Sequence, residues 1–332
     1  MFGKIIMFTR EKKLQSVKNY KKLAPLNAKL RKQKALFDEQ LKQNLISRKQ
    51  FVVVCGPCSA DDPVAMEEYL LKLKSVASEC PNLLVVARIY TSKPHSNGQG
   101  YKGTAFQLTS NDCVDIDEGI IRCRKLMLKC LEIGLPVADE MLYPELYRYF
   151  DDLVSYWFVG ARSSEDSLHR GFVSGLDICC GIKNSTDGNI DKVVDSLYAV
   201  SNKCVYPYNS FQISTNGCKY AHVVLRGGQN EGEFVSNISA KEIAYAKKHL
   251  QQLGLNDFVM ADLNHANSGK VAGRQMKNAQ LAVSAGVDGV MIESYLNSGG
   301  HSVEYGTSQT DDCLSFEDTE RLLREIFLLK QS

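Results

Sequence analysis

The chain has 332 residues, of which 44% are hydrophobic and 23% charged, the composition of an ordinary globular protein. Its net charge of +2 argues against a general affinity for nucleic acid or for a membrane surface, and no apolar run approaches the length of a membrane span. The eleven cysteines lack the paired spacing of a zinc module. Several lie within apolar runs, so we expect buried free thiols, as in a reducing cytoplasm.

Residues 1–50 are strongly basic, with 14 Lys and Arg against three acidic residues, so the rest of the chain carries a charge of −9. This segment is either a basic arm for an anionic partner or a solvated extension or subunit contact, and the pattern favours the second interpretation. Phe37, Leu41 and Leu45 recur at helical spacing, which predicts an amphipathic helix over residues 29–47.

After residue 50, short apolar runs alternate with helical patterns. The first run, Phe51 to Cys55, is rich in β-branched residues and has no polar face, as in a strand of a parallel sheet. The expected strands cover residues 51–55, 83–87, 136–138, 156–159, 178–182, 221–225, 258–263 and 289–292. The expected helices begin near residue 63 and then cover residues 115–133, 144–153, 165–174, 190–201, 240–253, 270–285 and 316–329. A polar, aromatic stretch at 204–219 is expected to insert a hairpin before the sixth strand.

Eight strands alternating with helices predict an α/β fold, a (β/α)₈ TIM barrel. We expect two parts: an N-terminal extension over residues 1–50, serving oligomer contact or regulation, and a catalytic barrel over residues 51–332. The alternative fold is an open, doubly wound sheet, but no strand is followed by a Gly-x-Gly-x-x-Gly fingerprint.

Polar or ionisable residues follow the apolar runs, and in a closed barrel they would meet at one mouth. In chain order they are Cys58, Arg88, Glu140, Arg162, Lys183, Arg226, His265 and Glu293. A structural ion pair would explain any single cation among them. Four together predict a pocket for a small, multiply charged anion, formed by Arg88, Arg162, Lys183 and Arg226.

A second set offers one thiol, one imidazole and two carboxylates, from Cys58, His265, Glu293 and Asp311. These ligand types suit a divalent ion of intermediate softness, namely Mn, Fe, Co or Zn. The spacing carries no local metal motif. A core thiol would explain Cys58 alone, and a structural histidine would explain His265 alone.

Several short motifs occur in a characteristic order. They are Gly56-Pro57-Cys58-Ser59, Arg88-Ile89-Tyr90 with Lys93-Pro94, Gly160-Ala161-Arg162, Lys183-Asn184 with Thr186-Asp187-Gly188, Leu225-Arg226-Gly227-Gly228, His265-Ala266-Asn267-Ser268 and Met291-Ile292-Glu293-Ser294. In this order they resemble the type I 3-deoxy-D-arabino-heptulosonate 7-phosphate (DAHP) synthases of the larger subgroup with an N-terminal extension. The resemblance covers about residues 50–329.

The resemblance implies a metal-dependent barrel, assembled as a homodimer or homotetramer, that condenses phosphoenolpyruvate with erythrose 4-phosphate and releases phosphate. By position, the metal ligands would be Cys58, His265, Glu293 and Asp311. Phosphoenolpyruvate would be held by Arg88, Arg162, Lys183 and Arg226, with Glu140 nearby. Lys93 would lie between the two substrates and act in catalysis together with Cys58 and His265.

One motif departs from the family. The aldehyde-binding loop usually reads Lys-Pro-Arg-Thr, whereas here it reads Lys93-Pro94-His95-Ser96. Histidine lacks the bidentate fork with which arginine binds phosphate. Either a nearby cation such as Lys102 compensates, or the enzyme serves a specialised pathway with a different aldehyde.

Three further functions stay open at this point. The chain could be another phosphoenolpyruvate-condensing barrel, such as a 3-deoxy-manno-octulosonate 8-phosphate synthase, although its extension and its 89–103 loop fit that group less well. It could be a catalytically inactive regulatory barrel, but it retains all four candidate metal ligands. A nucleic-acid binder using the basic segment lacks any recognised binding module.

Overall fold

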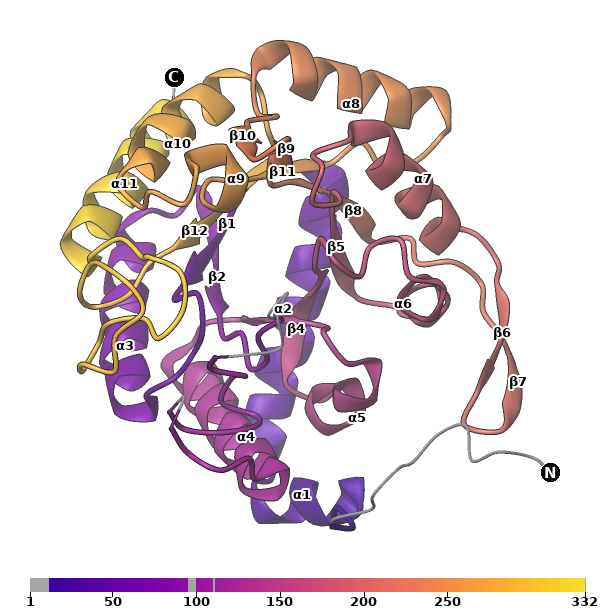
Figure 1. The fold of residues 1–332 in the computed structure, drawn as a ribbon, viewed down its shortest axis with the longest axis vertical. Coiled ribbons are helices and arrows are strands. Elements are labelled where there is room, and N and C mark those ends of the chain that lie inside the picture. Colours follow the sequence, from indigo (N-terminus) through magenta and orange to yellow (C-terminus); the bar gives the residue numbers. More distant parts are fainter. Residues whose placement is uncertain (1–11, 95–99, 110, 332) are drawn as a thin grey trace.

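The structure is a computed structural model that describes residues 12–94, 100–109 and 111–331. Within these ranges, eight parallel strands close into a barrel and helices surround it (Figure 1). This confirms the predicted (β/α)₈ barrel. In order around the barrel, the strands are β1 (Phe51–Gly56), β2 (Leu83–Arg88), β3 (Val137–Glu140), β4 (Val154–Val159), β5 (Cys179–Lys183), β8 (Ala221–Leu225), β11 (Val259–Asp262) and β12 (Gly289–Glu293).

The barrel strands are buried on both faces, which is why their sequences are continuous apolar runs. In β1, Val52 and Val54 belong to the cluster that fills the barrel, whereas Val53 and Cys55 pack in the larger cluster between strands and helices. Neither face of such a strand has room for solvated side chains. Polar residues within the strands are therefore few, and those present, such as Ser155 of β4 and His222 of β8, are fully buried.

Several of the surrounding helices begin or end at capping residues. Asp62 caps the first of them with Pro63 in its first turn, Ser239 and Glu242 form a capping box, and Gly134 ends a helix at a φ of 92°. The helices are α3 (Pro63–Glu79), α4 (Ile116–Ile133), α5 (Tyr147–Phe150), α6 (Ser167–Val173), α7 (Ile190–Ser201), α8 (Ala240–Gln252), α9 (His265–Ser268), α10 (Arg274–Ser284) and α11 (Phe316–Leu329).

Two helices precede the barrel, α1 (Val17–Leu23) and α2 (Ala28–Ser47), and the second confirms the helix predicted for residues 29–47. Leu41 and Leu45 of α2 are 1% exposed and join the cluster inside the barrel. In Figure 1, α2 passes behind the ring of strands. It thus covers the opening opposite the one we describe below as the site.

Basic residues of the extension form ion pairs with acidic residues of the barrel. Nζ of Lys42 lies 2.7 Å from Oδ2 of Asp177, and Nε of Arg48 lies 3.2 Å from Oδ1 of Asp288. Lys12 and Lys21 make comparable pairs with acidic residues near α4 and α5. The uneven charge of the sequence is therefore balanced in part within the molecule.

The hairpin expected at 204–219 is present as β6 (Val205–Tyr208) and β7 (Phe211–Ser214). The sequence did not predict α1 or the small ribbon of β9 (Gly228–Asn230) and β10 (Glu233–Val235). The helix predicted for 270–285 begins only at Arg274, because Gly269 and Lys270 have φ values of 62° and 61° that end α9. The segment predicted as a helix at 144–153 begins with a 3₁₀ turn, Pro144–Leu146, and ends at Phe150.

All eleven cysteines lie within the described residues, and all are free thiols, nine of them buried. Among the described helices, we find none that combines the length and the apolar character needed to cross a membrane.

Candidate active site

Five barrel strands end in a charged residue, and these ends lie on the same rim. Arg88, Glu140, Lys183, Asp262 and Glu293 are the last residues of β2, β3, β5, β11 and β12. All five are at most 9% exposed. Because the strands are parallel, their carboxyl ends meet at one opening of the barrel.

A cavity of about 690 Å³ opens at this rim. Eight of the residues predicted for the site line it: Lys93, Pro94, Glu140, Arg162, Lys183, Arg226, His265 and Asp311. Cys58, Arg88 and Glu293 are more deeply buried and contact residues of this lining or one another. His95 and Ser96 lie outside the described residues.

The cavity wall is rich in positive charge. Arg162, Lys183 and Arg226 line it together with Lys93. Burial lowers the pKa of Arg226, and the neighbouring Arg162 lowers it further. Asp262 offsets part of this charge, since its Oδ2 lies 3.1 Å from Nζ of Lys183. A small anion in the cavity would reduce the repulsion among the remaining cations.

Arg88 lies behind this wall in a buried ion pair. Its Nη2 is 2.6 Å from Oε1 of Glu293, and its Nε donates a hydrogen bond of 3.0 Å to the carbonyl of Pro57. The guanidinium also covers the ring of Tyr90, with 3.8 Å between its central carbon and the ring centre. Arg88 is therefore held by protein groups and fixes Glu293.

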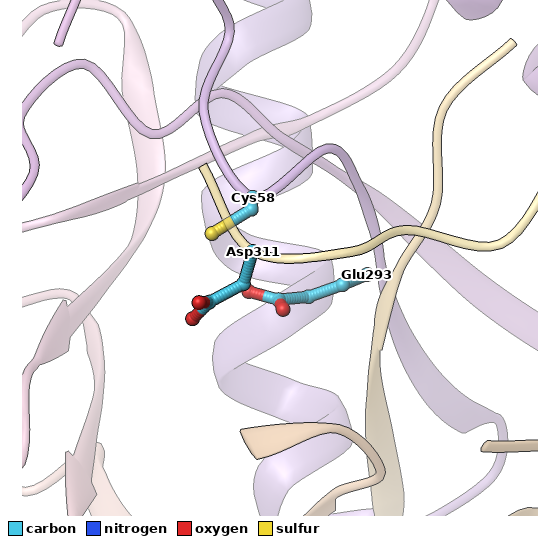
Figure 2. A group of neighbouring side chains, drawn as sticks. All are labelled: Cys58, Glu293 and Asp311. Atoms are coloured by element: carbon cyan, nitrogen blue, oxygen red, sulfur yellow. The ribbon is translucent and has the colours of Figure 1, made fainter. Parts of the chain in front are cut away.

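Three of the four predicted metal ligands lie together. One ligand atom each from Cys58, Glu293 and Asp311 lies within 4.8 Å of the other two, and Figure 2 shows these side chains turned toward a common point. Burial opposes ionisation of both carboxyl groups. Nearby cations outweigh it, so the pKa of Glu293 falls below its usual value and that of Asp311 falls to about 2.

The fourth predicted ligand, His265, stands beside this group but outside the mutually close set. Its Nε2 lies 3.8 Å from Oε1 of Glu293. Its Nδ1 lies 2.8 Å from Oδ2 of Asp262 without the alignment of a hydrogen bond. His265 has a φ of 44°, a strained backbone for a residue with a side chain.

The chemistry of these four groups fits a divalent cation. Burial raises the pKa of the Cys58 thiol, and the negative charge of Glu293 raises it further. A cation bound between the two ionised carboxylates and the thiol would offset their negative charge and would favour the thiolate. Mixed sulfur, nitrogen and oxygen donors are characteristic of transition metals rather than of Ca²⁺ or Mg²⁺.

Lys93 connects the metal-ligand group to the cavity. Its Nζ donates a hydrogen bond of 2.8 Å to the carbonyl of Cys58 and lies 3.0 Å from the Sγ atom of that residue. Its loop is held at Thr91, whose N–H and hydroxyl donate to the buried carboxylate of Asp139 over 3.0 and 2.9 Å.

The position of the Glu140 carboxylate depends on a glycine at position 160. A Cβ atom at position 160 would lie 2.2 Å from Oε1 of Glu140. Only glycine at this position leaves the carboxylate where it is, at the edge of the cavity.

The sequence analysis missed several residues that hold the site in place. Asp262 contacts both Lys183 and His265. Burial opposes its ionisation, but its interactions with these two side chains outweigh burial and hold its pKa below the usual range. Gln275 of α10 exchanges two hydrogen bonds of 2.9 Å with the backbone of Glu293. Asp262 could have been predicted, because it is the charged residue that ends the apolar run of β11. Gln275 is separated from Glu293 by 18 positions and offered no local signal.

Comparison with known proteins shows the family of the chain. The model of the DAHP synthetase I family matches residues 39–324. The Tyr-sensitive phospho-2-dehydro-3-deoxyheptonate aldolase of Escherichia coli K12 is 34% identical, in an alignment covering 97% of this chain and 94% of the relative. The Phe-sensitive aldolase of the same organism is 36% identical over 83% of each chain. A phospho-2-dehydro-3-deoxyheptonate aldolase from Francisella tularensis SCHU S4 superposes with a TM-score of 0.91 and 28% identity, covering 98% of this chain and 99% of its own. The chain belongs to the DAHP synthetase I family.

Proposed function

We propose that this protein condenses phosphoenolpyruvate with erythrose 4-phosphate to give DAHP and phosphate, the first step of the shikimate pathway. The observation that carries the proposal is one cavity, in a member of this family, that joins a cationic wall to the group formed by Cys58, Glu293 and Asp311.

In this proposal, Arg162, Lys183 and Arg226 hold the carboxylate and phosphate of phosphoenolpyruvate. This substrate carries about three negative charges near neutral pH, which the cations would offset. Arg88 acts at the base of the same site, with its guanidinium kept in place by Glu293. Glu140 lies at the edge of the phosphoenolpyruvate site.

Cys58, His265, Glu293 and Asp311 would hold a divalent ion, for which Mn, Fe, Co and Zn are the candidates. When bound, this ion would supply Lewis-acid polarisation of the aldehyde oxygen. His265 would complete the ligand set through Nε2, the ring nitrogen that lies 3.8 Å from Glu293.

The reaction then needs one proton at the new hydroxyl group. C3 of phosphoenolpyruvate attacks the aldehyde carbon, water adds at C2, and the resulting hemiketal phosphate loses phosphate. Lys93 is the proposed donor of the proton to the aldehyde oxygen, because its ammonium lines the cavity beside Cys58.

A different acceptor aldehyde is the second candidate, and the replacement of the usual Arg-Thr pair by His95-Ser96 favours it. An aldehyde that lacks a phosphate would not need the missing arginine. Lys102 is the nearby cation in the sequence that could compensate if the phosphate is present.

We also propose a homodimer or homotetramer in the cytoplasm. Val205 and Phe211 of the β6–β7 hairpin are 63% and 70% exposed, as expected of a surface that a second subunit covers. Nine buried free thiols suit a reducing compartment. Light scattering of the purified protein would measure the subunit number directly.

The activity is tested with a panel of aldehydes. Purified protein, Mn²⁺ and phosphoenolpyruvate are mixed with erythrose 4-phosphate or with other aldoses, with and without phosphate, and phosphate release is followed. Release with erythrose 4-phosphate supports the main proposal, and release with another aldehyde alone supports the second. No release with any aldehyde after metal supplementation would contradict both.

A pair of cysteine variants makes this test specific. Cys58→Ala should abolish phosphate release because it removes a proposed metal ligand. Cys80→Ala should retain activity, since Cys80 is equally buried, at 1% exposure, but follows α3 outside the cavity lining.

A further inference from the structure

Asn237 is a buried residue that does not line the cavity but bonds to the loops behind it. It follows β10 and is 4% exposed. Its Oδ1 accepts a hydrogen bond of 2.8 Å from the N–H of Gly227. Its Nδ2 donates to Oδ1 of Asn184 and to the carbonyl of Gly188, both at 3.1 Å. All these partners belong to the segments that follow β5 and β8.

Asn184 extends this contact to Arg226. The Oδ1 atom that accepts from Asn237 also accepts from the N–H of Arg226 at 2.8 Å. Nδ2 of Asn184 donates to the carbonyl of Gly227 at 2.9 Å. The two amides together therefore bind the N–H groups of Arg226 and Gly227 and the carbonyl of Gly227.

The turn at Gly227 has little room to move. Its φ is 72°, and a Cβ atom there would lie 2.7 Å from the backbone nitrogen of Asn267. Oδ1 of Asn267 in turn accepts a hydrogen bond of 3.0 Å from the N–H of Asn237. The turn is thus fixed between the Asn237 segment and the segment of α9.

The side chain of Arg226 depends on the same turn. Its Nη1 donates to the carbonyl of Gly227 at 3.3 Å, so the direction of the guanidinium follows the position of that carbonyl. The carbonyl is held by Asn184, and Asn184 is held by Asn237. A displaced turn would move the guanidinium away from the cavity.

We propose that Asn237 is a positioning residue for anion binding, which acts through Asn184 and the Gly227 turn to hold Arg226 at the phosphoenolpyruvate site. This inference rests on the proposed function, because it assigns to Arg226 the binding of that substrate. Asn237 itself touches no substrate.

The test is a double-mutant cycle on phosphoenolpyruvate binding, measured by calorimetry on the full chain with Mn²⁺, together with steady-state kinetics. Asn237→Ala should weaken binding and raise the KM for phosphoenolpyruvate about 10- to 100-fold, with a smaller change in kcat, because misplacing a binding group costs this much. In an Arg226→Ala background, Asn237→Ala should cause little further loss, since the group it positions is absent.

Asn44→Ala is the matched control. Asn44 lies near the end of α2 and outside the cavity lining, is also 4% exposed, and exchanges two hydrogen bonds with Gln50, at 2.8 and 2.9 Å. It should lose thermal stability while keeping the wild-type KM. If Asn237→Ala does not fold, Asn237→Asp takes its place, because it has nearly the same volume and replaces the Nδ2 donors with a charged carboxylate oxygen that cannot donate to Asn184 or Gly188.

The outcomes separate the two proposals. If the wild type binds phosphoenolpyruvate and Arg226→Ala weakens binding, the inference is overturned by an unchanged KM in the Asn237 variant. Equal losses in the wild-type and Arg226→Ala backgrounds, or an equal loss in Asn44→Ala, would also overturn it. If the wild type neither binds phosphoenolpyruvate nor releases phosphate, the proposed function fails and the inference fails with it.

Discussion

At the scale of single residues, Lys93 has the most sharply defined place in the site. Its ammonium is bound by the carbonyl of Cys58, so its position depends on the turn after β1 as well as on its own loop. It lines the cavity and lies 3.0 Å from a proposed metal ligand. This place is consistent with its proposed role as the proton donor.

Lys93→Met should abolish turnover while phosphoenolpyruvate still binds. Methionine keeps the length and the apolar stem of the side chain but cannot donate a proton. Phosphate release and calorimetric binding are the two measurements. Lys129→Met, on the outer face of α4, should leave both unchanged. A variant at position 93 with more than about a tenth of the wild-type kcat would exclude general acid catalysis, which contributes about 100-fold or more.

His222 of β8 is a buried titratable residue that the proposed mechanism does not use. It is fully buried inside the barrel, where its Nε2 lies 2.6 Å from the hydroxyl of Tyr156 and its ring meets that of Phe258 edge to face. Burial lowers the pKa of His222 to about 3. The imidazole is thus neutral in the folded protein at any pH at which the enzyme would work.

This histidine should make the protein less stable in acid. Below about pH 6.5 the unfolded chain takes up a proton at His222, but the folded chain does not until about pH 3. The free energy of unfolding should therefore fall as the pH is lowered, by about 2 kcal/mol at pH 5 from this residue alone. Urea unfolding of the wild type and of His222→Asn at pH 7.5 and pH 5 measures the difference. An equal loss of stability in the two proteins would contradict the assignment.

At the scale of elements, most of the site residues that could be predicted lie at the ends of the strands. Arg88, Glu140, Lys183 and Glu293 were found because an apolar run ends in a charged residue, and both faces of these strands are buried. The segments after the strands were predicted less well. The break between α9 and α10 depends on left-handed backbone at Gly269 and Lys270, and the identity of Lys270 gives no sign of this conformation.

Gly160, which follows β4, should matter for substrate binding but not for folding. An alanine Cβ would meet the end of the Glu140 side chain, which can rotate away at little cost to stability. Gly160→Ala should therefore keep a melting temperature near that of the wild type and raise the KM for phosphoenolpyruvate. Gly273→Ala is the control, since its Cβ would meet no atom within 4 Å. A Gly160→Ala enzyme with unchanged kinetics would show that the position of Glu140 does not matter.

The packing of α2 against the barrel interior should make the extension part of the same folding unit. Leu41 lies with Val52, Val54 and Met260 in the inner cluster. Leu41→Ala should lower the free energy of unfolding by about 2–5 kcal/mol, the usual loss for a fully buried leucine. Leu36→Ala, at a position of α2 that is 70% exposed, should have little effect. A loss below 0.5 kcal/mol at Leu41 would mean that α2 is only loosely attached.

At the scale of the whole molecule, the barrel was predictable because strand patterns and helix patterns alternate regularly along the sequence. The order of the short motifs identified the family. The supporting contacts were not predictable. Gln275 to Glu293 and Asn237 to Gly227 join residues whose proximity exists only after the barrel has closed. The ion pairs of the basic segment with Asp177 and Asp288 likewise depend on where α2 packs, which composition alone does not reveal.

The central claim is that side chains from eight separate strands and loops form one metal site beside one anion site. A crystal structure of the protein grown with Mn²⁺ and phosphoenolpyruvate, with anomalous data at the manganese edge, tests it most directly. The account predicts an anomalous peak about 2–2.6 Å from ligand atoms of Cys58, His265, Glu293 and Asp311. The substrate carboxylate and phosphate should contact Arg162, Lys183 and Arg226. A manganese peak elsewhere, or phosphoenolpyruvate bound away from these cations, would contradict it.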